Sequence, residues 1–539
     1  MDDSRLRQRG VTELDEFHQS KNETNVYQEE RSQSGSPSGV IDVTHAVRAR
    51  QLDRFIGFLP ILSFAATLLG SWESLSATFV AGLYNGGPVA LVWGCLMSVI
   101  GALALSSSIA EMASIIPVAG AQYHWTARYA PGASNFFGLM QGWLTVFGWL
   151  ALVAVPPYFS ATLIEGLVIL NYPDWVPKQW HGTLLMWASM VAPVVLNMYG
   201  RWIIPPLEIL GMVLHLLLLP VFVIIMVCLA PRSSPSFVFT TFVGDQSGYT
   251  NNGVMFSLGL LTAAYAMVGF DGPLHMSEEV RNSKVNVPKA MVLGTLINGI
   301  MAFGWVITLL FTMGDIEAAL STPTGYPIIE IFYQATGSLA ATNTMMAFLM
   351  IAGYVSLFGC FASVSRLVWA FARDNGLPFA SFFVYVSPTL KIPTRALGLV
   401  VVVVVLLSFI ELGSLAAFNA LTSLSTLALY VSYVLPVLFF MIHKLRGREV
   451  LWGPFRMAKV FPAPFGEIFA IFVNMFAIAW GVYIVIFLPW PSTVPVTLQT
   501  LNWSGPVFGF VMLLALLDWF ISGRKRFVAP HKVLQEDVE

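Results

Sequence analysis

Two acidic residues lie inside long apolar stretches of this sequence, each preceded by an aromatic residue and close to a glycine. An ionised carboxylate at the centre of a bilayer costs about 2.5 to 3.5 kcal/mol, so it is rarely kept there without a task. Glycines beside the acids can break a helix, and two interrupted helices, one in each half of a chain, point to a transporter's binding site. The candidate binding residues are Gly70, Ser71, Trp72 and Glu73 in the first stretch and Gly269, Phe270 and Asp271 in the second.

The chemistry of these residues favours a positively charged ligand. A carboxylate next to an indole suits an ammonium group, through charge and through cation–π attraction. We therefore expect Glu73 to bind a substrate amine or a proton, the alternative being a pairing with a polar neighbour in the helix bundle. For Asp271 a structural or gating role competes with binding. Trp72 and Phe270 are expected as gates or walls of the pocket, although such residues also fill helix cores or face lipid.

The composition places these residues in a membrane. Of 539 residues, 56% are hydrophobic and 11% charged, with a mean hydropathy of +0.72, whereas a globular chain carries about 25% charged residues. The third predicted span is over-long and contains Pro156 and Pro157, so it should kink or tilt. Twelve windows reach the length of about 20 residues that crosses a bilayer: 56–83, 88–110, 134–167, 181–199, 206–230, 253–275, 291–313, 341–372, 396–412, 415–441, 465–489 and 505–522.

The basic residues predict the orientation of these spans, because short basic loops stay on the cytoplasmic side. With twelve spans and a cytoplasmic N-terminus, 26 of the 28 Lys and Arg residues fall on the inner side, Lys178 and Arg232 being the exceptions. Both termini are therefore expected in the cytoplasm. No basic stretch indicates a nucleic-acid partner.

The ends of the chain differ from its middle. Residues 1–52 are polar and include a Ser- and Gly-rich stretch, so a disordered cytoplasmic tail is expected there. Residues 53–525 form the predicted twelve-helix domain, and 526–539 a cytoplasmic C-terminal tail. The first span should serve as its own insertion signal, because no cleavable signal peptide precedes it. The three cysteines fall in apolar spans and suggest neither disulfides nor a metal site.

The two glycine-containing breaks also suggest an internal repeat. They fall in the first and sixth predicted spans, and five spans begin at each. Since an odd span enters from one side and an even span from the other, the two five-span units would be inverted. Such repeats bring two half-helix breaks together at the bilayer midplane, where free N–H groups attract carboxylates and free C=O groups attract cations.

Three longer stretches carry a family resemblance. In them the chain resembles the amino acid-polyamine-organocation superfamily, and within it the fungal-type amino acid/choline/γ-aminobutyrate permeases, over about residues 50–525. The resemblance implies an all-α, LeuT-like fold with a five-plus-five inverted repeat and broken helices 1 and 6. It also implies uptake of a small amine-bearing solute by a unit for which a monomer suffices, by default in the plasma membrane, with the vacuolar membrane as an alternative. The stretches are Glu111–Trp125, Gly269–Val280 followed by Val287–Met291, and Ser365–Pro378.

Charged residues at the predicted inner surface are candidates for a gate. A cytoplasmic gate made of ion pairs is one interpretation, and a set of solvated loop charges is the other. His215 in the fifth span has a side chain suited to relaying protons, but a neighbour could equally satisfy it. Some superfamily members place a lysine in this span for coupling, and this chain has none there. The gate candidates are Glu111, Glu278, Glu279, Arg366 and Arg373.

Enzyme functions find no support in the sequence. It contains no HExxH zinc pair, no GxSxG nucleophile turn and no Walker loop for ATP, and no cofactor or metal is expected. We therefore predict a secondary transporter that works by alternating access and is coupled to protons. The alternatives are a nutrient sensor of the same fold, which would bind without accumulating solute, and a channel. Which amine is carried stays open between amino acids, γ-aminobutyrate, polyamines and choline.

Overall fold

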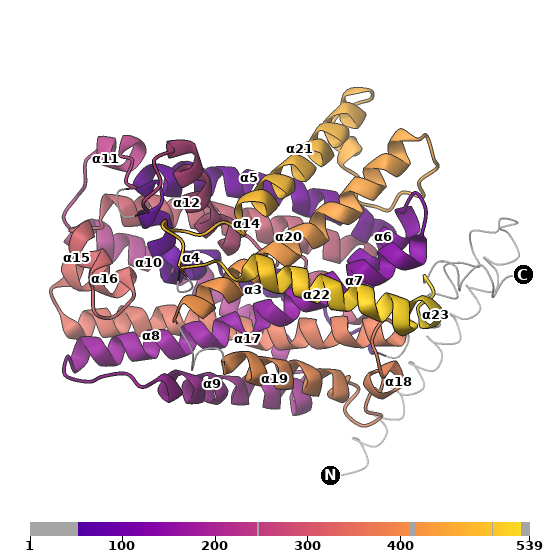
Figure 1. Cartoon of the computed structure of the whole chain (residues 1–539), viewed down its shortest axis with the longest axis horizontal. Coiled ribbons are helices and arrows are strands. Elements are labelled where there is room, and N and C mark those ends of the chain that lie inside the picture. Colours follow the sequence, from indigo (N-terminus) through magenta and orange to yellow (C-terminus); the bar gives the residue numbers. More distant parts are fainter. Residues whose placement is uncertain (1–51, 245–246, 410–414, 498–499, 530–539) are drawn as a thin grey trace, which may run out of the picture. The chain divides into compact units, whose positions relative to one another are not determined.

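The computed structural model describes residues 52–244, 247–409, 415–497 and 500–529, with side chains left out for 415–420. Within these ranges the regular structure is helical, apart from one β-bridge between Ile56 and Val280 (Figure 1). The longer helices are α3 (Phe58–Leu69), α4 (Ser71–Tyr84), α5 (Gly87–Ile115), α6 (Ala121–Tyr129), α7 (Ser134–Val153), α8 (Val155–Asn171), α9 (Gln179–Tyr199), α10 (Ile204–Leu229), α12 (Asn252–Ala266), α14 (Ser283–Phe311), α16 (Pro327–Thr336), α17 (Leu339–Arg373), α19 (Thr394–Ser408), α20 (Leu415–Leu445), α21 (Phe465–Phe487) and α22 (Ser504–Asp518). The short ones are α11 (Pro235–Thr240), α13 (Gly272–His275), η1 (Ser277–Glu279), α15 (Ile316–Leu320), α18 (Ala380–Phe383), η2 (Met457–Val460), η3 (Trp519–Gly523) and α23 (Arg524–Arg526).

Most of these helices have the length and composition of membrane spans. Among the described residues, ten helices or helix pairs are long and apolar enough to cross a bilayer. Two shorter apolar helices, α12 and α19, fall where the sixth and ninth spans are predicted. The predicted separation of the ninth and tenth spans at Gly413 and Ser414 lies outside the described residues.

The first span is interrupted at Gly70, as its sequence suggests. The backbone there is left-handed, with φ 43° and ψ 49°, so α3 ends and α4 begins in a new direction. Glycine adopts this conformation without the penalty that a side chain would bring. Asn298 of α14 holds both ends of the break: its Oδ1 accepts from Ser71 N at 3.0 Å and its Nδ2 donates to Ala66 O at 3.0 Å.

The second break lies directly against the first. Helix α12 stops at Ala266, Gly269 has a φ of 99°, and the chain turns again into α13 at Gly272. A Cβ atom on Gly272 would meet Cδ2 of Leu68 at 2.0 Å, so glycine allows this approach to α3 without displacing the Leu68 side chain. Two segments about 200 residues apart in the chain therefore meet at their breaks.

The predicted kink of the third span is present. Helix α7 ends at Val153 and α8 begins at Val155, with prolines at its first turn. Proline lacks the N–H that would continue the helical bonding, which explains why the change of direction falls there.

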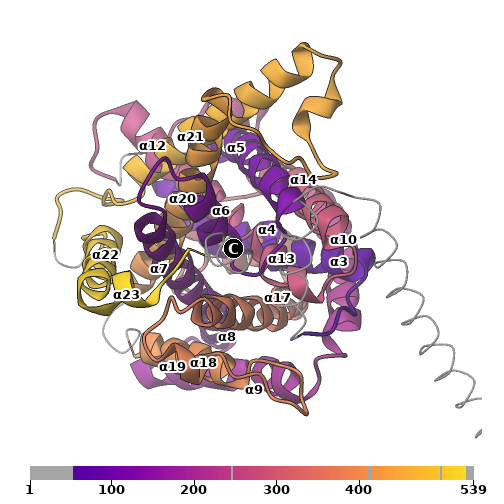
Figure 2. The same cartoon turned by 90° about the vertical axis from the view of Figure 1, so that its right-hand side faces the viewer.

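The helices that carry the breaks lie inside the bundle. Seen end-on, α4 and α13 lie among α5, α14 and α17, whereas α9, α21 and α22 lie at its edge (Figure 2). The edge helices leave most of their residues only partly buried or exposed, as helices facing lipid do.

Packed structure continues past residue 525. Phe527 is fully buried, and Arg526 forms an ion pair with Asp518 of α22 at 2.6 Å. The predicted tails at 1–51 and 530–539 lie outside the described residues.

Candidate functional site

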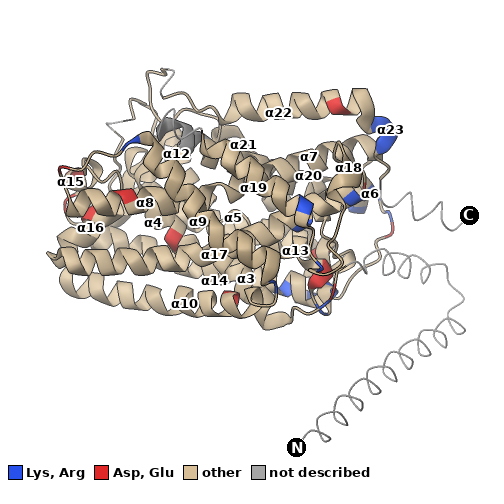
Figure 3. Cartoon of the chain, turned by 90° about the horizontal axis from the view of Figure 1, so that it is seen from below, with Lys and Arg blue, Asp and Glu red and all other residues tan. Residues whose placement is uncertain are grey.

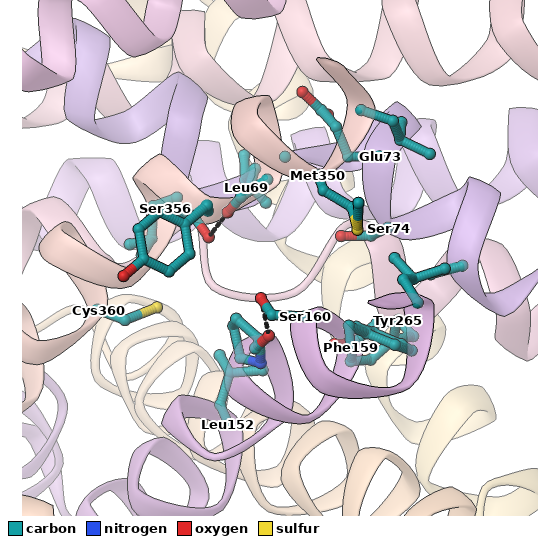
Figure 4. A pocket seen from close by; sticks show the side chains of 18 of the residues that line it. Leu69, Glu73, Ser74, Leu152, Phe159, Ser160, Tyr265, Met350, Ser356 and Cys360 are labelled. Atoms are coloured by element: carbon teal, nitrogen blue, oxygen red, sulfur yellow. Dashed lines mark hydrogen bonds between the residues drawn. The ribbon is translucent and has the colours of Figure 1, made fainter. Parts of the chain in front are cut away.

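A cavity of about 90 Å³ lies at the break between α3 and α4. Its walls come from four parts of the chain that sequence alone does not bring together: the α3–α4 break, the end of α7 with α8, the end of α12 and the middle of α17. Figure 4 shows side chains from these elements pointing into one space. We call it the central cavity, and its polar and aromatic lining includes Glu73, Ser74, Phe159, Ser160, Tyr265 and Ser356.

Glu73 is the acidic residue of the central cavity. Its side chain is nearly buried, and Oε1 lies 2.8 Å from Nδ1 of His215 on α10. Oε2 is buried and has no hydrogen-bond partner among the described residues. That oxygen lies 3.8 Å from where a Cβ of Gly70 would be, so it faces the helix break. A carboxylate with one paired and one unpaired oxygen has the capacity to accept a further donor.

The helix ends around the cavity also favour a cation. The cavity is lined by Leu69 at the C-terminus of α3 and by Val268 just after the C-terminus of α12. Helix C-termini carry partial negative charge on unpaired carbonyls, whereas the N-terminus of α4 favours an acid in its first turn, where Glu73 lies.

The aromatic wall of the central cavity differs from the predicted one. Phe159 and Tyr265 line it, with ring centroids 6.5 Å apart in an edge-to-face arrangement. Trp72 is fully buried behind it, against Phe222 and Trp305. The direction of Trp72 follows from the rotation of α4, which sequence spacing does not fix.

Asp271 lies outside the central cavity, and its carboxyl accepts several hydrogen bonds. Oδ1 accepts from Tyr433 OH at 2.6 Å, and Oδ2 accepts from Gln122 Nε2 at 2.5 Å and Trp149 Nε1 at 3.0 Å. His275 Nε2 is 3.5 Å away. The carboxyl is completely buried and thus joins the second break to α6, α7 and α20.

The structure separates the seven predicted binding residues into two groups. Gly70 and Glu73 line the central cavity, whereas the other five, Ser71, Trp72, Gly269, Phe270 and Asp271, do not. Phe270 packs on Tyr433 with ring centroids 4.5 Å apart, next to the Asp271 network. The second break therefore contributes its helix end to the cavity, while its acid faces the packed side.

The predicted gate residues come together in pairs at one end of the bundle. Arg366 Nε contacts Glu279 Oε1 at 2.7 Å with both side chains buried, and Arg373 Nη1 contacts Glu278 Oε2 at 2.9 Å. Glu111 is not paired with either arginine but lies 3.7 Å from Nζ of Lys444. Figure 3 shows Lys and Arg gathered at this end, where α6, α13 and α23 lie. We call these three pairs the ion-pair cluster.

A fourth acid extends the ion-pair cluster. Asp374 Oδ2 accepts from Tyr123 OH at 2.7 Å and lies 2.8 Å from His124 Nε2. Burial alone would raise the pKa of Asp374, but His124, Arg373 and the Tyr123 hydroxyl lower it to about 2. Burial and the same carboxylate raise the pKa of Tyr123 well above its usual value. Asp374 is therefore charged at every physiological pH and Tyr123 is neutral.

Sequence reasoning missed several residues around the helix breaks and in the ion-pair cluster. The sequence does not single out Asn298 and Tyr433, because an amide and a phenol inside apolar helices give no signal until their partners are known. Lys444 and Asp374 lie at helix ends in the region where the gate was predicted, so charge at the same surface was a usable signal.

The comparisons with known proteins decide the family. A model of the family described as amino acid permease matches residues 56–513. The chain belongs to the amino acid permease family. This permease is 29% identical to the choline transporter of Saccharomyces cerevisiae, over 89% of this chain and 83% of the relative. It is also 29% identical to amino-acid permease 2 of Neurospora crassa, over 89% and 86%, and 28% identical to an amino-acid permease of Arabidopsis thaliana, over 89% and 93%.

Membership in the family establishes the general activity. The permease is a multi-pass integral membrane transporter of the amino acid and choline permease type, not an enzyme, and its family implies a LeuT-like fold.

Proposed function

We propose that this permease imports a small amine-bearing solute together with protons, by alternating access around the central cavity. The observation that carries the proposal is Glu73, an acid at a helix break with one oxygen on His215 and the other unpaired in the cavity. The wall around that oxygen is made of helix C-termini and aromatic rings, which attract cations and repel anions.

The substrate amine is assigned to Glu73, and its remaining groups to the opposite wall. An ammonium at Oε2 has the faces of Phe159 and Tyr265 within the same cavity, so these rings take the role first given to Trp72. The names of the relatives include a choline transporter and amino-acid permeases. We extend this range to the present chain as choline, γ-aminobutyrate or an amino acid.

The fold supports alternating access between two inverted units. We infer twelve spans, in which the first five and the next five are related by inversion, because the two breaks touch and each begins a five-span unit. In this scheme the ion-pair cluster is the inner gate, which is closed in this structure because its pairs are made. The two buried pairs Arg366–Glu279 and Arg373–Glu278 must separate for substrate to leave.

The distribution of basic residues supports the orientation. The ion-pair cluster lies at the end where Lys and Arg gather, which the positive-inside rule assigns to the cytoplasm. We therefore propose that both termini lie inside. The plasma membrane is proposed from the family resemblance, with the vacuolar membrane as the alternative.

Uptake by a host strain lacking its own amine carriers tests this function. The full chain is expressed and the cells receive radiolabelled choline, γ-aminobutyrate, lysine and spermidine in turn, with an empty vector as control. We expect concentrative uptake of one of these classes that rises as the outside pH falls. Binding without accumulation by purified protein would favour the nutrient sensor instead.

A further inference from the structure

Glu208 on α10 is a buried acid that the proposed substrate site does not use. Its side chain is 1% exposed, and its neighbours come from α3 and α17, both of which also line the central cavity. Oε2 is hydrogen-bonded to the hydroxyl of Thr67, three residues before the break at Gly70. Oε1 has no hydrogen-bond partner among the described residues, and a Cβ on Gly359 would lie 2.9 Å from it.

The hydrogen bonds of Thr67 fit two protonation states of Glu208. The Thr67 hydroxyl has a single proton but lies within bonding distance of three acceptors, the carbonyls of Ser63 at 2.9 Å and Phe64 at 3.3 Å and the carboxyl of Glu208. If that proton goes to Ser63, the contact with Glu208 requires a carboxylic acid that donates to Thr67. If Glu208 is ionised, the hydroxyl turns to donate to it. A small rotation of the Thr67 hydroxyl thus accompanies the gain or loss of a proton by Glu208, beside the first break.

The surroundings of Glu208 contain little that would hold it permanently charged. The titratable groups facing it are Cys360 and Arg366 on α17, Glu279 on η1 and Arg201 before α10. Arg366 is engaged with Glu279, and Arg201 with Asp53. Helix α3 has no titratable residue, and Lys284 and Lys289 of α14 are exposed. An ionised carboxyl without a cationic partner is costly in such a place, whereas a neutral acid is not.

Glu208 also lies between the central cavity and a second, smaller cavity. It lines a side cavity of about 20 Å³ together with Arg366 and Glu279 of the ion-pair cluster, a space with room for about one water. On the other side, Gly359 adjoins Cys360, which lines the central cavity. His215, the partner of Glu73, lies seven residues further along α10, about 10 Å away by helical rise. Gly211 between them packs tightly on Thr67 and Val355.

We propose that Glu208 is the carboxyl that carries the coupled proton of this permease. While the central cavity is open to the outside, it takes a proton from a hydronium ion: an O–H bond of that ion breaks, one O–H bond forms on the carboxylate, and a water molecule is left. When the pairs around Arg366 separate, the O–H bond of the acid breaks and the proton passes to water in the side cavity, which restores the carboxylate and forms a hydronium ion. The proposal rests on the proposed proton-coupled uptake and assigns the proton to a residue distinct from the substrate acid Glu73.

Proteoliposomes containing the full chain test this assignment. Glu208→Gln keeps the shape and the donor to Thr67 but cannot release a proton, so exchange of radiolabelled choline or γ-aminobutyrate across the membrane should continue. Accumulation driven by a pH gradient, which one proton per substrate limits to about tenfold per pH unit, should fall to the level without a gradient. Glu208→Asp should restore part of it. Glu165→Gln, which changes a half-buried acid outside both cavities, should accumulate like the wild type.

Infrared difference spectra between the purified wild type and each variant provide an independent readout. The wild type should show a carboxylic-acid absorption that disappears in Glu208→Gln and not in Glu165→Gln. Identical spectra for wild type and Glu208→Gln, or unchanged gradient-driven accumulation in that variant, would overturn the assignment. A sodium requirement that vanishes in Glu208→Gln would replace the proton by a metal cation and also overturn it. If neither labelled solute moves in the wild type, the proposed substrate is wrong, and the infrared result alone decides on Glu208.

Discussion

At the scale of single residues, the two acids beside the helix breaks have different surroundings. Glu73 has one oxygen free for a ligand, whereas Asp271 receives hydrogen bonds from Tyr433, Gln122 and Trp149. The chain motifs around the two acids are alike, so this difference arises from tertiary packing. We therefore propose that Glu73 binds the ligand and that Asp271 supports the second break.

Neutralising Glu73 should weaken substrate binding. Glu73→Gln removes a charge-assisted contact with the amine, typically worth about 1.5 to 3 kcal/mol. Because about 1.4 kcal/mol is tenfold in affinity, the apparent affinity should fall by roughly ten- to hundredfold. Concentration-dependent uptake measures it, with Glu165→Gln as the matched control and surface expression checked. Normal affinity in Glu73→Gln would leave that acid as a partner of His215 only.

Replacing Asp271 should instead affect stability and maximal flux. In Asp271→Asn the amide NH₂ faces groups that are themselves donors, and each buried group left unsatisfied costs about 1 to 3 kcal/mol. Tyr433→Phe removes a single donor and should have a smaller effect in the same direction. Thermal unfolding in detergent and the maximal uptake rate, measured for both variants, check this prediction. A large loss of affinity with unchanged stability would move Asp271 into the binding site.

At the scale of elements, the breaks and the ion-pair cluster depend on contacts between distant helices. Asn298 of α14 bonds to both sides of the α3–α4 break, and the start of α13 packs on α3 through Gly272. The ion-pair cluster likewise joins η1, α17, α5 and α20. Opening the proposed inner gate therefore requires η1 and α17 to move apart as units.

The buried pair Arg366–Glu279 should show strong coupling. Removing one partner leaves a buried charge unpaired, which costs about 3 to 5 kcal/mol, whereas removing both charges costs less. The single variants Glu279→Gln and Arg366→Met should therefore lower the thermal stability more than their combination does. The exposed pair Arg201–Asp53 serves as control, because Asp53→Asn should change stability by about 1 kcal/mol or less. Additive effects at Arg366 and Glu279 would argue against a closed gate.

At the scale of the whole molecule, orientation is testable without knowing the substrate. On a background lacking Cys95, Cys228 and Cys360, the exposed positions Thr250 and Ser321 should react as cysteines with an impermeant reagent in sealed cells. An exposed cysteine at Glu449, in the 443–464 segment, should react only after the membrane is opened. Labelling of that third position in sealed cells would reverse the proposed topology.

The sequence predicted the architecture better than the site. Apolar windows, the glycines at the breaks and Pro156 and Pro157 act through local chemistry, and the helices follow them. The direction of Trp72, the support from Asn298 and the position of Glu208 depend on contacts across 140 residues or more. A residue in an apolar helix shows its type in the sequence, but the side of the helix that faces a cavity is fixed only by packing.

The central claim is that the cavity at Glu73 carries an amine coupled to protons. The most direct measurement is the accumulation of radiolabelled choline or γ-aminobutyrate by proteoliposomes of the purified chain under an imposed pH gradient. We predict that the inside concentration rises above the outside one when the outside is more acidic, that a protonophore abolishes the difference, and that Glu73→Gln requires far more substrate. Accumulation that persists unchanged after the proton gradient is dissipated, or that is equal in Glu73→Gln, would contradict it.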